Sequence, residues 1–371
     1  MSSSYTVPIM HMVSKPLRVI QWGTGGVGRA AIDNVVNHPD LELAGCWVHS
    51  SGKNGRDVGE IAGREPLGLT ATSNIDELLA LDADCVMYSP LMANDDDVKA
   101  ILRSGKNIVT PVGWVYPDLT NPKVQAILDA ANDGRATLHG SGIHPGGITE
   151  RFPLMVSALS SAITHIRAEE FSDIRTYNSP DVIRQIMGFG GSAEDAVRGP
   201  MAAMLASGFK MSVRMVADYL AFRTDPQIRT TQEVAVATSD IDSEVLPIAA
   251  GTVAGRRFRW EALVDGEPVI TAAVNWLMGE ADLDTGWTFG DSGERFEVEI
   301  TGDPDVSLIF KGVHPESITQ GLERNPGVVA TANHCVNAIP YVCAAPPGIK
   351  TYLDLPLIAG RPARKLSAVN S

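Results

Sequence analysis

Three glycines near the start of the chain have a spacing that could bind the phosphates of a nucleotide. Gly23, Gly25 and Gly28 follow a short apolar run, and apolar residues at helical spacing come directly after them. The first glycine permits a tight turn, the second lets a pyrophosphate approach the backbone, and the third lets the helix pack against the strand. We therefore predict that Gly23, Thr24, Gly25, Gly26, Val27 and Gly28 bind a dinucleotide at the helix start; a glycine-rich turn without a ligand is the alternative.

A polar loop after the next predicted strand favours a phosphorylated nucleotide. That strand, residues 41–48, ends where dinucleotide-binding folds often carry a carboxylate for the ribose 2′-hydroxyl. This chain has no carboxylate there, and hydroxyls and cations follow instead. Such groups suit charge-assisted hydrogen bonds to a 2′-phosphate, so we predict NADP(H) as the preferred cofactor and leave NAD(H) open. The residues concerned are His49, Ser50, Ser51, Lys53 and Arg56, and a solvated loop is the alternative.

Composition excludes several classes of function. The 371 residues are 44% hydrophobic and 20% charged, which is typical of a globular protein with more than one domain. A net charge of −14 without clustered basic residues argues against nucleic acid or a membrane surface as partner. The four cysteines lack Cys-x-x-Cys spacing and the histidines form no metal pattern, so we expect free thiols, a cytoplasmic location and no metal.

The first half of the chain predicts a doubly wound parallel sheet. Strand-like runs alternate with helical stretches up to residue 140, and residues 68–72 are predicted as a weak strand. We assign residues 17–148 to a Rossmann dinucleotide-binding domain, preceded by a loose tail over residues 1–16. Because ligands bind at the carboxyl ends of such strands, the predicted cofactor site also includes Ser89, Pro90 and Pro111.

The second half predicts an α+β domain over residues 149–327. Helical stretches at 193–206 and 210–222 precede long, partly polar strands, which favour a mostly antiparallel sheet covered on one face. The open face of such a sheet suits a homodimer contact. A helix rich in small residues begins the last segment, residues 328–371, and we expect it to pack back on the first domain. The predicted fold class is therefore α/β, with a Rossmann sheet and a second α+β domain.

Three side chains near predicted strand ends are candidate proton handlers. His144 has a pKa class suited to acid–base catalysis near neutrality, or it hydrogen-bonds the backbone of its own turn. Tyr116 and Tyr177 are further candidates, although both also suit pocket walls. Glu150 is expected to be a carboxylate at a helix start rather than a base. A mostly apolar substrate pocket is predicted from Trp114, Met92 and Phe171.

Three motifs together resemble one family of oxidoreductases. They are the glycine turn, the segment Gly142-Ile143-His144-Pro145-Gly146-Gly147, and the segment from Val336 to Gly348. The chain resembles the dihydrodipicolinate reductase-like oxidoreductases, in the branch of 2,4-diaminopentanoate dehydrogenase and the native amine dehydrogenases. The resemblance implies a Rossmann domain plus an α+β domain, usually in a dimer. It also implies NAD(P)H-dependent interconversion of a carbonyl compound and ammonia with a primary amine.

The chain departs from this family at the expected substrate site. Amine dehydrogenases of the branch place a glutamate after the strand that corresponds to residues 108–110, where it holds the amine. Here residues 111–118 contain no glutamate, and Asp118 is shorter and later. Apart from this departure, the resemblance implies hydride transfer to a C=N group formed from an aldehyde or ketone and ammonia. The alternatives are a carbonyl or imine reductase that needs no ammonia, and a non-catalytic protein that senses NADP(H).

Overall fold

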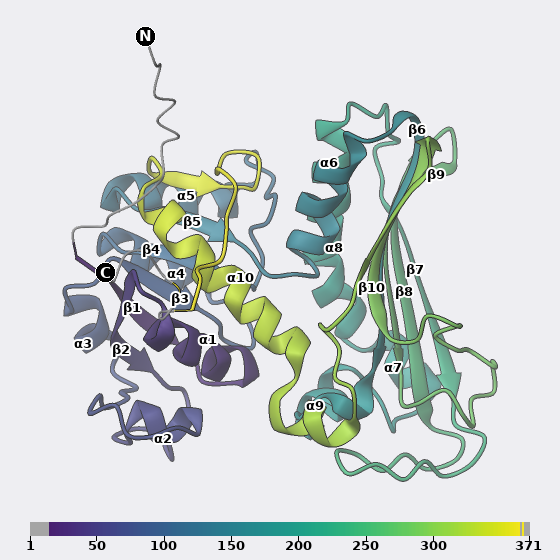
Figure 1. Cartoon of the computed structure of the whole chain (residues 1–371), viewed down its shortest axis with the longest axis horizontal. Coiled ribbons are helices and arrows are strands. Elements are labelled where there is room, and N and C mark those ends of the chain that lie inside the picture. Colours follow the sequence, from purple (N-terminus) through teal and green to yellow (C-terminus); the bar gives the residue numbers. More distant parts are fainter. Residues whose placement is uncertain (1–14, 364–365, 367–371) are drawn as a thin grey trace.

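The N-terminal half of the molecule is a six-stranded parallel sheet with helices on both faces (Figure 1). The computed structural model describes residues 15–363 and 366, so most of the predicted tail lies outside the described residues. The chain winds from β1 to β2 on one side and to β3, β4 and β5 on the other, so a ligand crevice is expected at the carboxyl ends of β1 and β3. In spatial order the strands are β12 (Gly348–Lys350), β5 (Thr137–Gly140), β4 (Asn107–Thr110), β3 (Cys85–Tyr88), β1 (Leu17–Trp22) and β2 (Leu41–Trp47).

The helices of this domain begin at polar caps, with one exception. Asp57, Asn74, Asn94 and Asn121 each accept hydrogen bonds from the first backbone N–H groups of the helix that follows. The first helix has Gly25 at this position and no side-chain cap, so its free N–H groups face the ligand edge. The helices are α1 (Gly26–Asn37), α2 (Val58–Ala62), α3 (Ile75–Ala80), α4 (Asp95–Arg103) and α5 (Pro122–Gly134).

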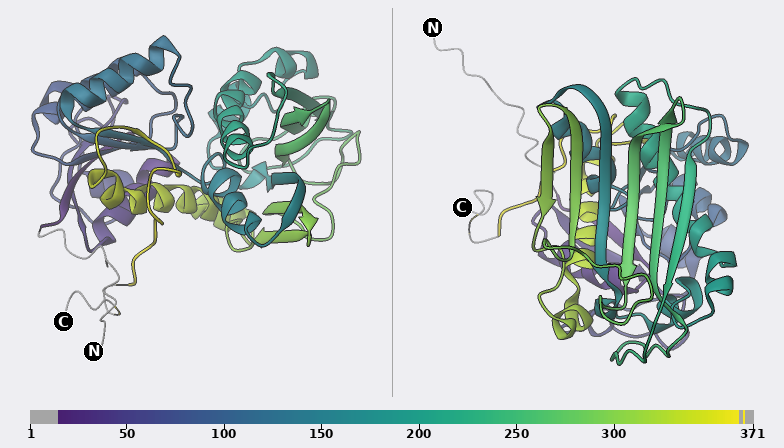
Figure 2. Two further views of the ribbon diagram at one scale, coloured as in Figure 1. Left: turned by 90° about the horizontal axis from the view of Figure 1, so that it is seen from above. Right: turned by 90° about the vertical axis from the view of Figure 1, so that its right-hand side faces the viewer.

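The second domain is built on a six-stranded sheet. Among the described strands of this sheet, β6 and β9 pair in parallel and all other neighbours are antiparallel. The order is β11 (Val306–Phe310), β10 (Arg295–Asp303), β6 (Ser161–Asp173), β9 (Glu267–Leu277), β8 (Val253–Val264) and β7 (Arg229–Val236). One face is covered by α6 (Phe152–Ser157) and α8 (Met201–Tyr219), and the other face is open (Figure 2). Together with the parallel first sheet, this arrangement confirms the predicted fold class.

Aromatic and aliphatic side chains fill the space between the second sheet and its helices. Phe209 of α8 stacks on Trp260 of β8 with ring centroids 4.3 Å apart, and both side chains are buried. Short elements complete this domain: the π-helices η1 (Gly147–Arg151) and η3 (Val182–Ile186), the 3-10 helix η2 (Ile174–Thr176), and α7 (Ala193–Arg198). The core face of the sheet therefore lies on the side of the first domain, and one layer of helices separates the two (Figure 1).

The C-terminal segment returns to the first domain. After α9 (Ile318–Arg324), helix α10 (Pro326–Cys343) crosses back and buries Ala332, Val336 and Ile339 against Val19 of β1 and Val35 of α1 (Figure 1). The chain then adds β12 to the free edge of β5. This last strand completes the first sheet with residues that lie about two hundred positions later in the chain than β5, as the pairing of Ile349 with Leu138 shows.

Two local predictions were wrong, and one strand was missed. Residues 68–72 form no strand, because only isolated bridges join Thr70 to Asp57 and Thr72 to Trp47. The break between the two helices of the second domain lies at Pro200 instead of residues 207–209, since proline has no N–H for the preceding helix. Gly208 stays helical, and a Cβ there would lie 2.8 Å from Pro145, so this glycine permits close packing. Strand β12 was not predicted.

Within residues 15–363, no helix combines the length and the apolar character that crossing a bilayer requires. All four cysteines are free thiols. The described residues contain no group of three or more His, Cys, Asp or Glu side chains that could hold a metal ion.

Candidate active site

The glycine turn has the geometry that a dinucleotide pyrophosphate requires. Gly23 has a φ of 94°, and a Cβ there would lie 2.8 Å from the carbonyl oxygen of Ser89. A Cβ at Gly28 would collide with the carbonyl oxygen of Gly23, so α1 packs on the turn only because both positions are glycine. A Cβ at Gly25 would meet nothing within 4 Å. The open space at Gly25 and the uncapped N–H groups of α1 fit a bound pyrophosphate.

Lys53 brings positive charge to this turn. Its Nζ donates to the carbonyl oxygen and to the Oγ1 of Thr24, each at 3.1 Å. Burial lowers the pKa of Lys53, and the nearby charge of Arg29 lowers it further. Arg29 therefore faces the same region, and the sequence analysis did not include it. The sequence could have indicated Arg29 by its position directly after Gly28, in the first turn of the predicted helix.

The remaining residues of the predicted 2′-phosphate loop are solvent-exposed. His49, Ser50, Ser51 and Arg56 all lie on the surface beside Lys53. The guanidinium of Arg56 is 3.9 Å from Glu60, and both side chains are 52% exposed. An exposed pair of this kind contributes little and leaves Arg56 free to turn towards an anion. The loop thus offers one fixed cation and one mobile one.

Ser89, Pro90 and Pro111 lie at the carboxyl ends of β3 and β4. The hydroxyl of Ser89 accepts a hydrogen bond from Gln21 at 2.8 Å and donates to the carbonyl oxygen of Trp22 at 3.3 Å. It is therefore already used within the sheet. Pro111 lies beside the start of the turn after β5, because a Cβ at Gly142 would be 3.7 Å from the Pro111 side chain.

Helix α10 forms one wall of the site, which the sequence analysis did not predict. A Cβ at Gly26 would lie 3.4 Å from Val328, and a Cβ at Gly142 would lie 3.7 Å from Thr331. The first turns of α10 therefore extend from the glycine turn to the end of β5. A nucleotide that lies along the carboxyl ends of the strands would pass along this helix.

A cluster of neutral polar groups closes the end of β5. Ser141 Oγ lies 3.1 Å from His334 Nδ1 and 3.3 Å from the hydroxyl of Tyr352. Burial lowers the pKa of His334 to about 4 and raises the pKa of Tyr352. Both groups are uncharged at neutral pH, so the cluster joins β5, α10 and the C-terminal segment by hydrogen bonds without a net charge.

His144 lies in the core of the second domain and not at a strand end of the first. Its side chain is 1% exposed, and its ring packs edge-on between Phe209 and Phe296. Nε2 is 3.2 Å from the carbonyl oxygen of Ala273 on β9, so the backbone that it contacts is not that of its own turn. Burial lowers the pKa of His144 to about 3. The predicted hydrogen bond to its own turn is therefore wrong, and the acid–base role of His144 stays a prediction.

Tyr116 connects the two domains. Its hydroxyl donates to Asp218 Oδ2 on α8 at 3.2 Å. Burial raises the pKa of Tyr116, and the negative charge of Asp218 raises it further. Tyr177 follows η2 in the second domain, where burial raises its pKa. No hydrogen bond or ring contact among the described residues links Tyr116, Tyr177 and His144. The structure does not bring the three candidates together, and their catalytic roles stay predictions.

Glu150 is fully buried in η1, between the two domains. Neither carboxyl oxygen has a hydrogen-bond partner within residues 15–363, although the hydroxyls of Ser212 and Thr149 lie nearby. Burial raises the pKa of Glu150 to about 8. Glu150 thus lies in the first turn of a helix, as predicted, and desolvation favours its protonated form.

A second buried carboxylate lies on β6. The Glu170 side chain is 13% exposed, and its Oε1 accepts hydrogen bonds from Trp276 Nε1 and Ser172 Oγ, both at 2.8 Å. Its Oε2 is 3.9 Å from His144 Nε2. Burial raises the pKa of Glu170. Sequence reasoning missed this residue because Glu169 and Glu170 are adjacent, and nothing in the pattern shows which of them faces the core.

The predicted apolar pocket does not form. Trp114 is 8% exposed within the core of the first domain, whereas Met92 is 62% exposed on a loop. Phe171 lies under the guanidinium of Arg295, 3.9 Å from its ring centroid. These three side chains do not share one space, so the substrate walls must come from other residues.

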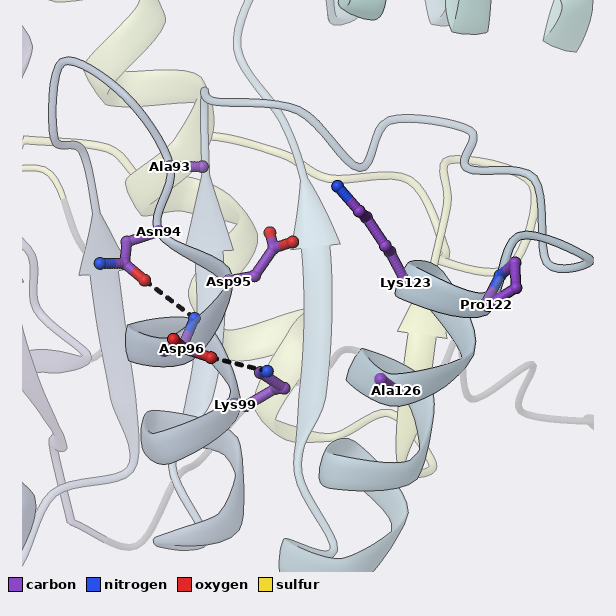
Figure 3. Close-up of a pocket in the computed structure, with 8 residues that line it drawn as sticks. All are labelled: Ala93, Asn94, Asp95, Asp96, Lys99, Pro122, Lys123 and Ala126. Carbon is purple, nitrogen blue, oxygen red and sulfur yellow. Dashed lines mark hydrogen bonds and ion pairs between the residues drawn. The ribbon is translucent and has the colours of Figure 1, made fainter.

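A solvent-open hollow lies between the first turns of α4 and α5 (Figure 3). Two polar contacts lie in this hollow: Asn94 caps α4 by accepting from the Asp96 N–H, and Lys99 pairs with Asp96 at 2.7 Å. The aspartates in this turn suit the helix dipole, as the sequence indicates. The lining residues are Ala93, Asn94, Asp95, Asp96, Lys99, Pro122, Lys123 and Ala126.

Comparison with known proteins gives consistent relatives. The family model of the 2,4-diaminopentanoate dehydrogenase C-terminal domain matches residues 148–367. The chain is 31% identical to an amine dehydrogenase of Streptomyces virginiae, over 95% of this chain and 100% of that protein. It is 24% identical to the 2,4-diaminopentanoate dehydrogenase of Acetoanaerobium sticklandii, over 92% of this chain and 94% of that protein.

A solved structure shares the fold. The structure of an amine dehydrogenase from Mycobacterium smegmatis superimposes with a TM-score of 0.75 at 20% identity, over 95% of this chain and 99% of that one. The likeness extends over both domains.

Proposed function

The chain belongs to the 2,4-diaminopentanoate dehydrogenase and amine dehydrogenase family, and on that premise we propose that it forms a primary amine from a small aldehyde or ketone, ammonia and NADPH. It is an amine dehydrogenase-type oxidoreductase, and the predicted family and enzyme class are confirmed. The overall reaction consumes one carbonyl compound, one ammonia, one NADPH and one proton, and it releases the amine, NADP⁺ and water. The observation that carries the proposal is the uncapped glycine turn beside a junction that holds two buried carboxyl groups.

The cofactor is a nicotinamide dinucleotide, which supplies a hydride when bound. The residues that would hold its pyrophosphate are the backbone groups of Gly23 to Gly28. The end of β4 and the turn after β5, at Pro111 and Gly142, would orient its other half against α10. The role of these residues is to position the ring and to exclude water around the reacting carbon.

We propose a preference for NADP(H), which Lys53, Arg29 and Arg56 support through their charge. Lys53→Ala is expected to weaken NADPH binding about 10- to 150-fold and NADH binding little, because a hydrogen bond to a charged group contributes about 1.5–3 kcal/mol. Arg56→Ala is expected to have a smaller effect, since its side chain is 52% exposed. The measurement is calorimetric titration of each variant with both cofactors. Equal losses for NADPH and NADH would contradict the assignment.

The activity test is NADPH oxidation with a panel of aldehydes and ketones, with and without ammonium chloride. Turnover that depends on ammonium supports the proposal. Turnover that proceeds equally without ammonium would select the carbonyl or imine reductase alternative. Tight NADPH binding without any turnover, together with a partner that binds one redox form only, would select the sensing protein.

We propose a homodimer that forms through the open face of the second sheet. Alternating arginines and glutamates cover this face, for example Arg259 and Glu233 at 3.4 Å. Light scattering after size exclusion measures the mass, and Arg259→Glu is expected to weaken the dimer. Four free thiols also suit a reducing compartment, so we propose a cytoplasmic location, which cell fractionation checks.

A further inference from the structure

We propose that Glu170 binds the nitrogen of the substrate, as the carboxylate that receives the N–H groups of an ammonium or iminium cation. The inference rests on the proposed amine-forming reaction and names the residue that recognises the nitrogen. It starts from the position of Glu170 on the core face of β6, where Ile166 and Ala168 of the same parity are buried against the helices.

Glu170 is largely buried, and no Lys or Arg within the described residues forms an ion pair with it. On the opposite face, Glu169, Glu297 and Glu299 all pair with the guanidinium of Arg167. The outward carboxylates are therefore compensated, and the inward one is not. A buried carboxylate without a cation is costly, so such a group either holds a proton or meets a ligand that supplies the positive charge.

The two carboxyl oxygens have different roles. Oε1 accepts from Trp276 Nε1 and Ser172 Oγ, which fix the plane of the group. Oε2 accepts no hydrogen bond from the described residues and is 3.9 Å from His144, whose Nε2 is within hydrogen-bonding distance of Ala273 instead. One oxygen is thus held in place by two donors, and the other is left for a donor that the chain does not provide.

The surroundings suit a small organic cation. Phe296 lies opposite Glu170 on the neighbouring strand, and the face of an aromatic ring attracts ammonium groups. The nearby imidazoles carry no competing charge at neutral pH, because burial lowers the pKa of His144 to about 3 and that of His314 to about 4. The imidazoles therefore do not repel a cation that approaches Glu170.

The position of Glu170 relative to the first domain also fits a role in binding the substrate nitrogen. His144, which faces Glu170, lies two residues after Gly142, and Gly142 packs against Thr331 of α10 and Pro111 at the end of β4. Glu170 thus lies on the second-domain side of the junction, and the expected nicotinamide half of the cofactor lies on the first-domain side. A nitrogen held at Oε2 would belong to a substrate placed between the two domains.

Binding without turnover is the first test. The full-length protein, without cofactor, is titrated with isopropylammonium chloride and with isopropanol at equal ionic strength. We expect the wild type to bind the ammonium in preference to the alcohol. Glu170→Gln keeps an acceptor for Trp276 and Ser172 but loses the charge, so its ammonium affinity is expected to fall about 10- to 150-fold. The matched control, Glu299→Gln, changes a 48% exposed carboxylate on the opposite face and is expected to bind like the wild type.

Steady-state kinetics provides the second test and separates the two proposals. Glu170→Gln is expected to raise the KM for ammonium by a similar factor while the KM for NADPH stays constant. For Glu170→Asp, we expect a KM for ammonium between that of the wild type and that of Glu170→Gln. A wild type that turns over without ammonium would refute the proposed function and not the site. A wild type that needs ammonium, with Glu170→Gln indistinguishable from Glu299→Gln in both tests, would overturn the inference.

Discussion

Replacement of Glu150 by glutamine should stabilise the protein in alkaline solution and not in acid. The group is fully buried and its carboxyl oxygens have no partner among the described residues, so the folded state keeps the proton that the unfolded state releases. Burial raises its pKa from 4.5 to about 8. Because the folded pKa is the higher one, the stabilisation is complete below the unfolded pKa and is lost as the pH rises towards the folded pKa.

The magnitude follows from this interval. One pKa unit corresponds to about 1.4 kcal/mol, so from about pH 5 to about pH 8 the wild type should lose roughly 3–4 kcal/mol of unfolding free energy through this group. Glutamine is neutral throughout and has nearly the same shape as the protonated acid. The stability of Glu150→Gln relative to the wild type should therefore increase by that amount over the same interval.

Urea unfolding, followed by tryptophan fluorescence at both pH values, measures the difference. Comparison with the wild type cancels the titration of all other groups. The control is Glu194→Gln, which changes a 68% exposed carboxylate on α7 and should leave the pH dependence unaltered. Parallel pH profiles for wild type and Glu150→Gln would refute the reasoning, because they would show that Glu150 titrates alike in the folded and unfolded states.

Four further substitutions test other parts of the structure. Gly28→Ala should lower the unfolding free energy by about 1–3 kcal/mol, because its Cβ would collide with Gly23, whereas Gly25→Ala should leave thermal unfolding unchanged and weaken NADPH binding in a titration. Tyr116→Phe removes an exposed hydrogen bond to Asp218, so kcat/KM should fall less than about tenfold; a loss above a hundredfold would show that Tyr116 handles the proton. Arg256→Ala should lower the unfolding free energy in urea by about 2–6 kcal/mol, because the carbonyl oxygens of Met187 and Ala196, which accept from this buried guanidinium at 2.6 and 3.0 Å, lose their donor.

Local sequence was sufficient for the glycine turn, for the parallel class of the first sheet and for the family. The glycine turn, the alternation of strands and helices, and the motifs after β5 and in α10 each depend on residues that are close together in the chain. Backbone freedom at Gly23 and periodicity in the helices are local properties, so they are readable without a structure. The fold class and the amine dehydrogenase type of chemistry followed from them.

The site depended on contacts between distant segments. Whether Glu169 or Glu170 faces the core is decided by the pairing of β6 with β9 and β10, and β12 joins a strand some two hundred residues earlier. The same holds for His144, which Phe209 and Phe296 enclose, and for Glu150, which has no partner in its buried position. The residue types were visible in the sequence, but burial sets the charge of each group, and burial is a property of the assembled domains.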